Sequence, residues 1–420
     1  MILENNPTLT IIGWCGIVLR MINKNIIGGG QVRGQIMGLN KPNQIQQPRI
    51  DKPEGDKTTR IATFTSDKSG CAHYRVIWPN YVLNSTKEYL INDMKKITIR
   101  DDAFFHGLDV IRFQRQVSNE QFQMFKWFRQ NCDKNGVRLM YELDDIPLYE
   151  DIPLYNKNRK SYARDDFRSN IINMMEMSDE ITVSTQFMKE YFRSKVKNTK
   201  ITHVPNYIPK FWMDRYYNED QLKVNFSKNK KKPRILYAGS ASHYALGSDV
   251  EDDFTKLVDY VKKTLKDYQW VFFGGLPRPL IPLYKEGKIE FHNYSPVVTY
   301  PETFKSIKPN VCIAPLIKNN FNRAKSHIKL TESAAYGIPC VCQSEIEPYG
   351  EAIYTFDTAS ELDDQIKKIT RDAGEYMKAC RKSRQIVEGH WLENNLDTWD
   401  ELYRLPFGHK DRINLNKINV

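Results

Sequence analysis

The sequence lacks several features that define specialised classes of protein. Its 420 residues include only seven cysteines, and none forms a Cys-x-x-Cys pair or stands at zinc-ligand spacing from a histidine. The longest apolar run, 9–19, is too short to span a bilayer, and the only charge before it is Glu4, whereas a secretory signal peptide carries positive charge there. With 40% hydrophobic and 27% charged residues, the composition excludes a disordered, collagen-like or coiled-coil chain. We therefore expect a globular cytoplasmic protein of two or three domains, with reduced thiols.

Positive charge is in excess, and it is concentrated in one part of the chain. The chain has 62 Lys and Arg against 51 Asp and Glu, a net charge of +11. The segment 193–234 alone contains twelve basic and three acidic residues, so it carries +9 and leaves +2 for the rest. A local excess of this kind indicates an anionic partner, which can be a nucleic acid, a nucleotide or a membrane surface.

The first 57 residues differ from the rest of the chain. A short apolar run is followed by three glycines, 28–30, and then by a polar stretch, 41–57, without a period that could bury one face. We interpret residues 1–57 as an extension or linker, whose apolar part is either a docking helix or a poorly ordered arm.

From residue 58 onward, short β-branched and aromatic runs alternate with amphipathic segments. This alternation predicts a parallel sheet covered by helices on both faces, and it occurs twice, in 58–206 and in 234–389, on either side of a polar basic connector, 207–233. The fold class expected is α/β, with two doubly wound Rossmann-like domains. Ligands of such sheets bind at the carboxyl ends of the strands. The predicted strands are 60–65, 109–115, 137–143, 180–184, 201–204, 234–238, 269–273, 311–315 and 340–343, and the predicted helices are 118–131, 167–177, 186–192, 250–265 and 326–336.

The segment 321–339 carries the strongest chemical signal. A helix that begins at Ser326 offers free backbone donors, and Lys325 and Lys329 lie one turn apart on the same side, a combination that suits a diphosphate. Glu332 lies about one turn beyond Lys329, where its carboxylate can accept hydrogen bonds from two ribose hydroxyls. The alternative is an ordinary amphipathic helix with Lys329 and Glu332 as a surface pair.

The run 311–349 resembles the donor-binding half of GT-B glycosyltransferases, specifically the retaining group-1 (family four) class. The resemblance rests on Pro315-Leu316, Lys325-Ser326, Glu332 and the Ala-Ala-Tyr-Gly-Ile-Pro of 334–339. It implies two domains that face a cleft, a nucleotide-sugar donor that is UDP-linked, a ribose contact at Glu332 and a diphosphate contact at Lys325 with donors from Ser326. The class usually has a further Glu where this chain has Ala324, which removes the sugar contact assigned there.

Other segments extend the resemblance over about 59–405. The segment 237–243 resembles the phosphate-side loop of the nucleotide-sugar domain, 234–389, which implies donor contacts from Gly239, Ser240 and His243. The segment 66–75 resembles the glycine loop of the acceptor domain, 58–206. That loop would bring Gly70 closest to the sugar and Arg75 near the cleft. Residues 390–405 resemble the terminal helix that packs back on the first domain, and 406–420 form a tail.

Three carboxylates close the strand predicted at 137–143. One of Glu142, Asp144 and Asp145 can act as the base for an acceptor hydroxyl or hold a sugar, because neighbouring carboxylates raise one another's proton affinity. The alternative is that the aspartates cap the following turn. Their spacing also imitates an Asp-x-Asp metal site, which we weigh lower because the two-domain pattern does not belong to that fold. In a retaining reaction the leaving diphosphate helps to deprotonate the acceptor, and Lys325 stabilises its charge. We therefore expect neither a required metal nor a tightly bound cofactor.

The acceptor is the least determined part of the prediction. If the basic segment 193–234 flanks the cleft, an anionic acceptor is favoured. We therefore prefer a hydroxymethylated base in bacteriophage DNA as the acceptor, which would place the protein in the host cytoplasm. The competing acceptor is a cell-surface polysaccharide or a lipid-linked glycan, with peripheral contact to a membrane and no transmembrane segment. A third hypothesis is a nonenzymatic nucleic-acid-binding protein that uses aromatic side chains for stacking.

Overall fold

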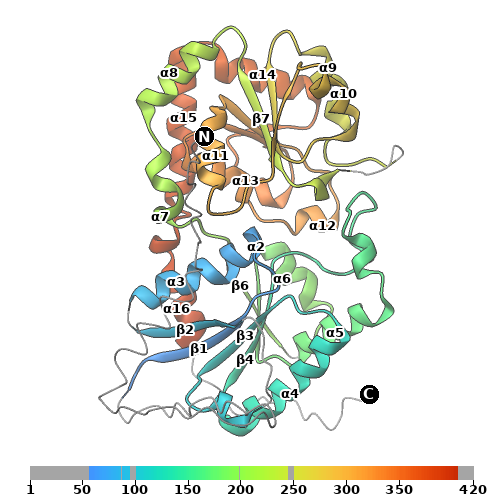
Figure 1. Ribbon diagram of the computed structural model, residues 1–420, viewed down its shortest axis with the longest axis vertical. Helices are drawn as coiled ribbons and strands as arrows, with labels where there is room; N and C mark the ends of the chain where they lie inside the picture. The colour runs from blue at the N-terminus through green and yellow to red at the C-terminus, as the bar shows by residue number, and fades with distance from the viewer. Residues whose placement is uncertain (1–55, 87, 95–100, 198, 245–249, 405–420) are drawn as a thin grey trace, which may run out of the picture. The chain divides into compact units, whose positions relative to one another are not determined.

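The computed structural model describes residues 56–86, 88–94, 101–197, 199–244 and 250–404 (Figure 1). The predicted extension, apart from its last two residues, and the predicted tail lie outside the described residues. Both sheets of the protein belong to one compact unit, 48–420. Within the described part of the chain, no helix is long and apolar enough to cross a bilayer.

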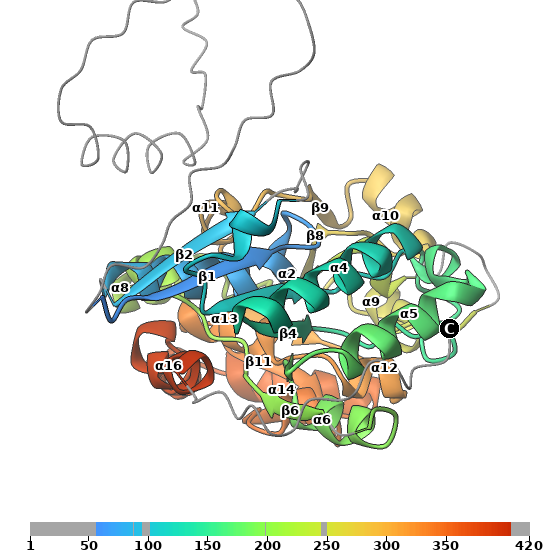
Figure 2. The same cartoon turned by 90° about the horizontal axis from the view of Figure 1, so that it is seen from below.

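The first half of the described chain forms a six-stranded parallel sheet. In spatial order its strands are β2 (Tyr89–Met94), β1 (Thr59–Phe64), β3 (Val110–Gln114), β4 (Arg138–Leu143), β5 (Glu180–Val183) and β6 (Lys200–His203). The intervening helices are α2 (Gly70–Ala72), η1 (His73–Ile77), α3 (Trp78–Ser85), η2 (Asp102–Phe105), α4 (Asn119–Asn135), η3 (Arg159–Tyr162), α5 (Asp165–Glu176) and α6 (Gln186–Arg193). Figure 2 shows α4 and α5 side by side on one face of this sheet, with α16 (Leu396–Arg404) on the other side.

The second half repeats the architecture with a second six-stranded parallel sheet. Its spatial order is β12 (Tyr354–Phe356), β11 (Cys340–Gln343), β10 (Val311–Ala314), β7 (Arg234–Gly239), β8 (Gln269–Gly274) and β9 (Glu290–Asn293). Its helices are η5 (Ala241–His243), η6 (Thr255–Leu257), α9 (Val258–Lys263), η7 (Arg278–Leu280), α10 (Ile281–Lys285), α11 (Tyr300–Ile307), α12 (Asn320–Arg323), α13 (Ile328–Ala335), η8 (Glu347–Tyr349), α14 (Ala359–Thr370), α15 (Ala373–Glu388) and η9 (Leu392–Asn394). The α/β class with two doubly wound sheets is confirmed.

Local sequence signals explain several element boundaries. Ser118 and Gln121 form the capping box expected at the start of α4, and Gly136 ends that helix with a φ of 68°. The connector, 207–233, contains α7 (Lys210–Met213), η4 (Asp214–Tyr216) and α8 (Glu219–Asn229), and Leu222, Asn225 and Phe226 are buried on one side of α8. One expectation is wrong. The helix predicted over 250–265 is limited to η6 and α9.

The chain passes between the two halves twice, and the two crossings pair with each other. The Ile208 N–H donates to the His390 carbonyl, and the Leu392 N–H donates to the Ile208 carbonyl, each at 2.9 Å. After the second crossing, α16 packs on the first half: the Arg112 guanidinium donates to the Tyr403 hydroxyl (2.7 Å), and that of Arg138 to a backbone carbonyl of the helix (2.6 Å). The last helix of the described chain therefore belongs to the first half.

Candidate functional site

The carboxyl edges of the two sheets face each other, and the loops that follow the strands are in contact (Figure 1). From the first half, the Thr185 hydroxyl donates to the Ala324 carbonyl (3.2 Å) and the Asn206 amide donates to the Ser326 hydroxyl (2.8 Å). A pocket of about 420 Å³ lies between the halves at this point, and Ser326 is among its lining residues. The segment predicted to hold a diphosphate thus lies where the first half can reach it.

The segment predicted to bind a diphosphate is built from two short helices rather than one. The side chain of Asn319 caps α12 by accepting from the Asn322 N–H (2.9 Å), and α13 begins only at Ile328, two residues later than expected. Lys325 and Ser326 therefore lie in the turn before α13. The Ser326 oxygen accepts from Asn206, so its own O–H is available to donate to a ligand.

The two lysines have different environments. The Lys325 ammonium lies 3.8 Å from an Asp145 oxygen of the first half and 4.5 Å from the centre of the Phe321 ring. The Lys329 ammonium donates to the Tyr237 hydroxyl (3.1 Å), and burial lowers the pKa of Lys329 to about 8. Neighbouring Lys325 lowers it further, although nearby carboxylates act in the opposite direction. An anion bound beside both ammonium groups would offset this repulsion.

Glu332 is held by two tyrosine hydroxyls, one from each half of the protein. Tyr74 of η1 donates to one carboxylate oxygen (2.7 Å), and Tyr300 of α11 donates to the other (2.8 Å). Burial raises the pKa of Glu332 to about 7, although these two hydrogen bonds lower it. The Tyr300 ring is itself fixed, because it stacks on Phe273 with ring centroids 5.2 Å apart. The two hydroxyls occupy the carboxylate oxygens that the sequence predicted for ribose hydroxyls, so a ribose contact at Glu332 stays a prediction.

Glycines let the backbone approach closely at the phosphate-side loop. A Cβ atom on Gly239 would lie 2.7 Å from the Tyr237 ring, and one on Gly274 would lie 2.9 Å from the Gly239 carbonyl oxygen. Gly274 also has a φ of 93°, a conformation that side chains rarely adopt. Ser240 follows Gly239, is exposed, and caps η5. The sequence indicated Gly239, whereas the pairing of Gly239 with Gly274, at the ends of the adjacent strands β7 and β8, is visible only in the fold.

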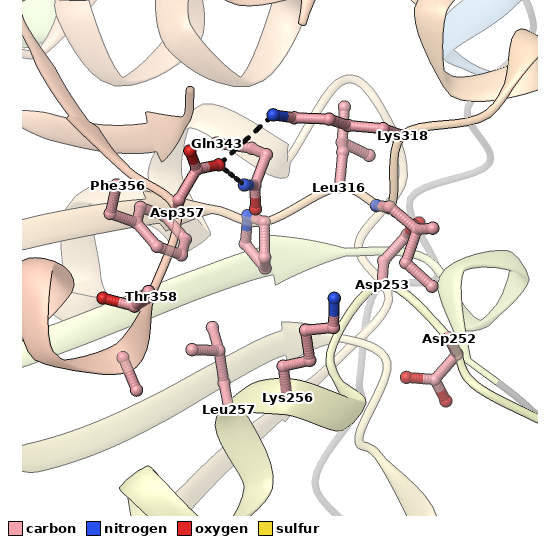
Figure 3. Close-up of a pocket in the computed structure, with 13 residues that line it drawn as sticks. Asp252, Asp253, Lys256, Leu257, Leu316, Lys318, Gln343, Phe356, Asp357 and Thr358 are labelled. Carbon is pink, nitrogen blue, oxygen red and sulfur yellow. Dashed lines mark hydrogen bonds and ion pairs between the residues drawn. The ribbon is translucent and has the colours of Figure 1, made fainter. Parts of the chain in front are cut away.

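His243 is buried and paired with a residue that the sequence analysis missed. Its Nδ1 lies 2.7 Å from Asp253 Oδ2. Asp253 also lines a pocket of about 630 Å³, drawn in Figure 3 with the side chains of Lys256, Lys318 and Asp357 around it. Asp253 follows the segment 245–249, outside the described residues, and no local motif marks it.

The three candidate carboxylates separate into three environments. Asp145 faces Lys325, and burial raises its pKa. Asp144 forms an ion pair with Arg115 at 3.3 Å. Glu142 points the other way, into the interior, and its side chain has no exposed surface. Only Asp145 therefore keeps the position expected of a group that meets substrate.

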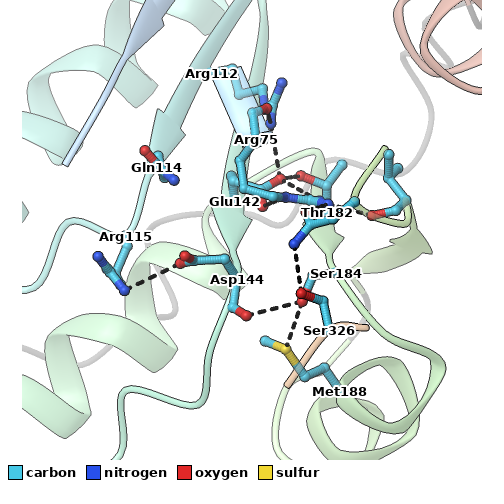
Figure 4. Close-up of polar contacts among 12 residues, drawn as sticks. Arg75, Arg112, Gln114, Arg115, Glu142, Asp144, Thr182, Ser184, Met188 and Ser326 are labelled. Carbon is cyan, nitrogen blue, oxygen red and sulfur yellow. Dashed lines mark hydrogen bonds and ion pairs between the residues drawn. The ribbon is translucent and has the colours of Figure 1, made fainter. Parts of the chain in front are cut away.

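Two expected site residues are instead partners in a buried ion pair, shown in Figure 4. Arg75 Nε donates to Glu142 (2.6 Å), Arg75 also donates to Asn206 (2.8 Å), and Arg112 donates to the same carboxylate (3.0 Å). The side chains of Arg75, Arg112 and Glu142 have no exposed surface. The predictions of an acceptor contact at Arg75 and a base at Glu142 are wrong, because neither can touch a substrate.

Gly70 opens α2 in the loop after β1. Among the described residues, nothing lies within 4 Å of a Cβ atom placed on it, so the local packing does not demand glycine there. Its expected contact with a sugar stays a prediction.

Two basic residues of the segment 193–234 do not lie beside this site. Lys200 and Arg234 each begin a strand, so they lie at the amino ends of the two sheets, away from the carboxyl ends that meet. Arg234 is also neutralised by Glu290 through two hydrogen bonds of 2.7 and 2.6 Å. These two residues therefore do not contribute to a basic face beside the cleft.

No group of three or more His, Cys, Asp or Glu side chains is placed to hold a metal ion in the described part of the chain. Lys325 and Lys329 are cationic groups at the candidate site that could balance a bound diphosphate, and Arg323 also lines the pocket between the halves.

Comparison with known proteins identifies the fold. No protein-family model matches the chain, and a search of curated proteins gives no match. Among solved structures, the catalytic domain of starch synthase IV from Arabidopsis thaliana, bound to ADP and acarbose, is 11% identical and has a TM-score of 0.55 over 82% of this chain and 99% of that one. The Anabaena protein Alr3699/HepE, in complex with UDP-glucose, is 10% identical and has a TM-score of 0.54 over 82% and 99% of the two chains. The chain therefore has the GT-B fold expected from its sequence.

Proposed function

We propose that this protein is a glycosyltransferase that moves a sugar from a UDP-sugar to an acceptor hydroxyl. The observation that carries the proposal is the meeting of Lys325 and Glu332, from the second half, with Asp145 and Tyr74, from the first half, at the carboxyl edges of the sheets. These are the groups required to hold a diphosphate and a ribose and to orient a hydroxyl. The solved structure of HepE with UDP-glucose has the same fold and supports the choice of donor.

In this proposal the basic residues bind the diphosphate, and the acidic residue Glu332 binds the ribose. Lys325 and Lys329 neutralise the diphosphate, and the Ser326 hydroxyl with the backbone around Gly239 and Ser240 donates to its oxygens. Glu332 accepts from the ribose hydroxyls after Tyr74 and Tyr300 are displaced. When the bond from the anomeric carbon to the diphosphate breaks, the two ammonium groups stabilise the charge that develops on the leaving oxygen.

We further propose that the reaction retains the anomeric configuration. The leaving diphosphate accepts the proton of the acceptor hydroxyl on the face where the new bond forms, so a protein nucleophile is not needed. Asp145, whose pKa is raised by burial, accepts a hydrogen bond from the sugar or from the acceptor and orients it.

For the acceptor, we propose a glycan in preference to DNA. The preference for DNA depended on a basic face beside the cleft, whereas Lys200 and Arg234 of the basic segment begin β6 and β7 and so lie at the amino ends of the two sheets. The hydroxymethylated DNA base and the nonenzymatic nucleic-acid-binding protein are the alternatives that the assay below separates.

The test is transfer of label by the purified protein. UDP-sugars labelled in the sugar are incubated with glycan, lipid-linked and hydroxymethylated duplex DNA acceptors. We expect label on a carbohydrate, loss of at least about 100-fold of the rate in Glu332→Ala and Lys325→Ala, and an unchanged rate in Glu302→Gln, an exposed carboxylate on α11. Unchanged turnover in Glu332→Ala refutes the site, and label on DNA alone refutes the glycan acceptor. Binding of DNA without any transfer or hydrolysis refutes the enzyme.

A further inference from the structure

Four donors from separate segments converge on the carboxylate of Asp253. Its Oδ2 accepts from His243 Nδ1 at 2.7 Å. Its Oδ1 accepts from the Ile317 N–H (2.9 Å), the Asn322 amide (2.7 Å) and the Tyr155 hydroxyl (2.9 Å). Tyr155 lies in the first half, between β4 and α5, whereas the others follow β7 and β10. One side chain without exposed surface thus connects the phosphate-side loop, the segment before α13 and the first half.

The partners of Asp253 determine its protonation state and that of the histidine. Burial raises the pKa of Asp253, but the hydrogen bonds and charges around it, His243 first, lower the pKa below its ordinary value. An ionised carboxylate only accepts hydrogen bonds, so the proton of the neutral imidazole must be on Nδ1 of His243. The remaining nitrogen, Nε2, then carries a lone pair.

Burial, together with the charges around it, keeps the His243 ring neutral in the absence of ligand. Burial lowers the pKa of His243 to about 4, and repulsion from Lys329 and Lys325 adds to this effect. Asp253 is the charged group that acts in the opposite direction. A ligand that neutralises the two lysines would remove their repulsion, so that the attraction of Asp253 would oppose burial alone and the pKa of His243 would rise.

We propose that Asp253 is a positioning residue of the donor site, which holds His243 in its Nδ1-protonated form and enables it to take up one proton from solvent when the diphosphate of a nucleotide sugar binds beside Lys325 and Lys329. This inference rests on the proposed function. The proton goes to Nε2, so the ring changes from neutral to positively charged. The site therefore gains a positive charge only when its ligand is present.

The geometry gives Asp253 a second consequence. Asn322, whose amide donates to Asp253 and to the Ile317 carbonyl (2.9 Å), is fully buried and lies three residues before Lys325. The Asp253 carboxylate therefore fixes the position of His243 relative to the segment that carries Lys325. Replacing it with an amide should disturb the proton on His243 even where the backbone is unchanged.

The test is nitrogen NMR of the histidine rings in the full-length protein, of which there are eight in the chain. The His243→Gln variant assigns the signals of His243. At pH 7, without ligand, we expect a neutral ring protonated on Nδ1. With saturating UDP-glucose, or with whichever of ADP-glucose and GDP-mannose binds, we expect both nitrogens to move to imidazolium values. Nucleotide sugars are suitable probes because their diphosphate does not itself titrate near pH 7.

Two variants, at Asp253 and at Asp252, separate the positioning role of Asp253 from a general effect on protein stability. In Asp253→Asn we expect the His243 ring to stay neutral when the donor binds, and the affinity for donor to fall about tenfold, since a charge-assisted contact is lost. The matched control is Asp252→Asn. It removes the carboxylate next to Asp253 in the sequence, which accepts hydrogen bonds from the Phe254 N–H and the Thr255 hydroxyl (both 2.9 Å). It should retain the imidazolium signal.

Each result decides the inference. A His243 ring that is protonated on Nε2 without ligand, or that stays neutral with donor bound, overturns it, as does an imidazolium signal in Asp253→Asn. If that variant does not fold, the two measurements on the unmodified protein still decide. Donor binding without protonation refutes only this inference, whereas failure of every nucleotide sugar to bind refutes the proposed function as well.

Discussion

The tyrosine pair on Glu332 leads to a prediction in which stability and ligand affinity change in opposite directions. Tyr74→Phe removes the hydroxyl that donates to Glu332 at 2.7 Å and keeps the ring, which is in edge contact with Trp78 and Trp212. At a pH above about 8, where Glu332 with its pKa of about 7 is ionised, a hydrogen bond to it contributes about 1.5 to 3 kcal/mol. The free protein should lose about this much stability.

Donor binding should respond in the opposite sense. If a ribose hydroxyl takes the place of Tyr74 on Glu332, the unmodified protein must break the tyrosine bond before the ribose can bind. The variant has no such bond to break, so its affinity for UDP or a UDP-sugar should rise by about tenfold, the equivalent of about 1.4 kcal/mol. Titration calorimetry measures the affinity, and urea unfolding measures the stability.

Tyr336→Phe is the matched control for this experiment. Its hydroxyl is buried, like that of Tyr74, but donates to the Pro301 carbonyl (2.8 Å) and not to Glu332. The control should lose stability with no gain in affinity. A Tyr74→Phe protein that binds the donor with the same or lower affinity would show that Glu332 does not receive the ribose.

Three further predictions test other parts of the site. Donor affinity should fall as the pH rises through about 8, because Lys329 then loses its charge, and the Lys329→Met variant should bind weakly without that dependence. The pKa of Lys329 is about 8 in the folded protein and 10.5 when unfolded, so unfolding takes up a proton between pH 8 and 10.5. The contribution of this lysine to the free energy of unfolding should therefore increase as the pH rises through this range. Urea titration at each pH measures it. Glu142→Gln should destabilise the protein by about 3 kcal/mol, because it leaves Arg75 and Arg112 buried without a carboxylate, and a fully stable but inactive variant would return Glu142 to the catalytic candidates. Gly239→Ala should lower donor affinity at least about tenfold while the fold is retained, because the new Cβ would lie only 2.7 Å from the Tyr237 ring and push that ring aside. Calorimetry measures the affinity, and circular dichroism checks the fold.

The fold was predictable because each local signal agreed with the next. The alternation of apolar runs and amphipathic segments identified nine of the strands, and the capping box at Ser118 marked the start of α4 to the residue. The strands that were missed, β2, β9 and β12, are edge strands or short ones, and β2 and β9 include exposed or half-buried polar residues such as Asp93 and Glu290, which weaken the pattern. Edge strands bury less surface, so their sequences are less constrained.

The candidate site was only partly predictable, for a different reason. Lys325, Lys329 and Glu332 stand in one segment, so their spacing could be read from the sequence. Tyr74 and Tyr300 reach Glu332 from 258 and 32 residues away, and no local pattern encodes such contacts.

The sequence position of a carboxylate in a strand does not by itself show whether its side chain faces a cleft or the interior. The nearness of Glu142 to Asp144 and Asp145 in the sequence predicts a residue that faces the cleft, whereas the fold buries it. The signal that could have corrected this is its place between Tyr141 and Leu143, in a strand buried along its whole length, with Arg112 in the adjacent strand. A buried carboxylate requires such partners.

The packing of α16 has a consequence for the order in which the molecule can be made. Trp399 stacks beneath the guanidinium groups of Arg75 and Arg112, at 5.7 and 4.6 Å, and Tyr403 accepts from Arg112. During synthesis the first sheet leaves the ribosome almost 200 residues before this helix. Until the last helix arrives, the first half carries a cationic cluster without its aromatic cover. The first half should therefore complete its folding only after the second half has been translated, and a ribosome-bound chain that stops before residue 396 should remain sensitive to protease in its first half.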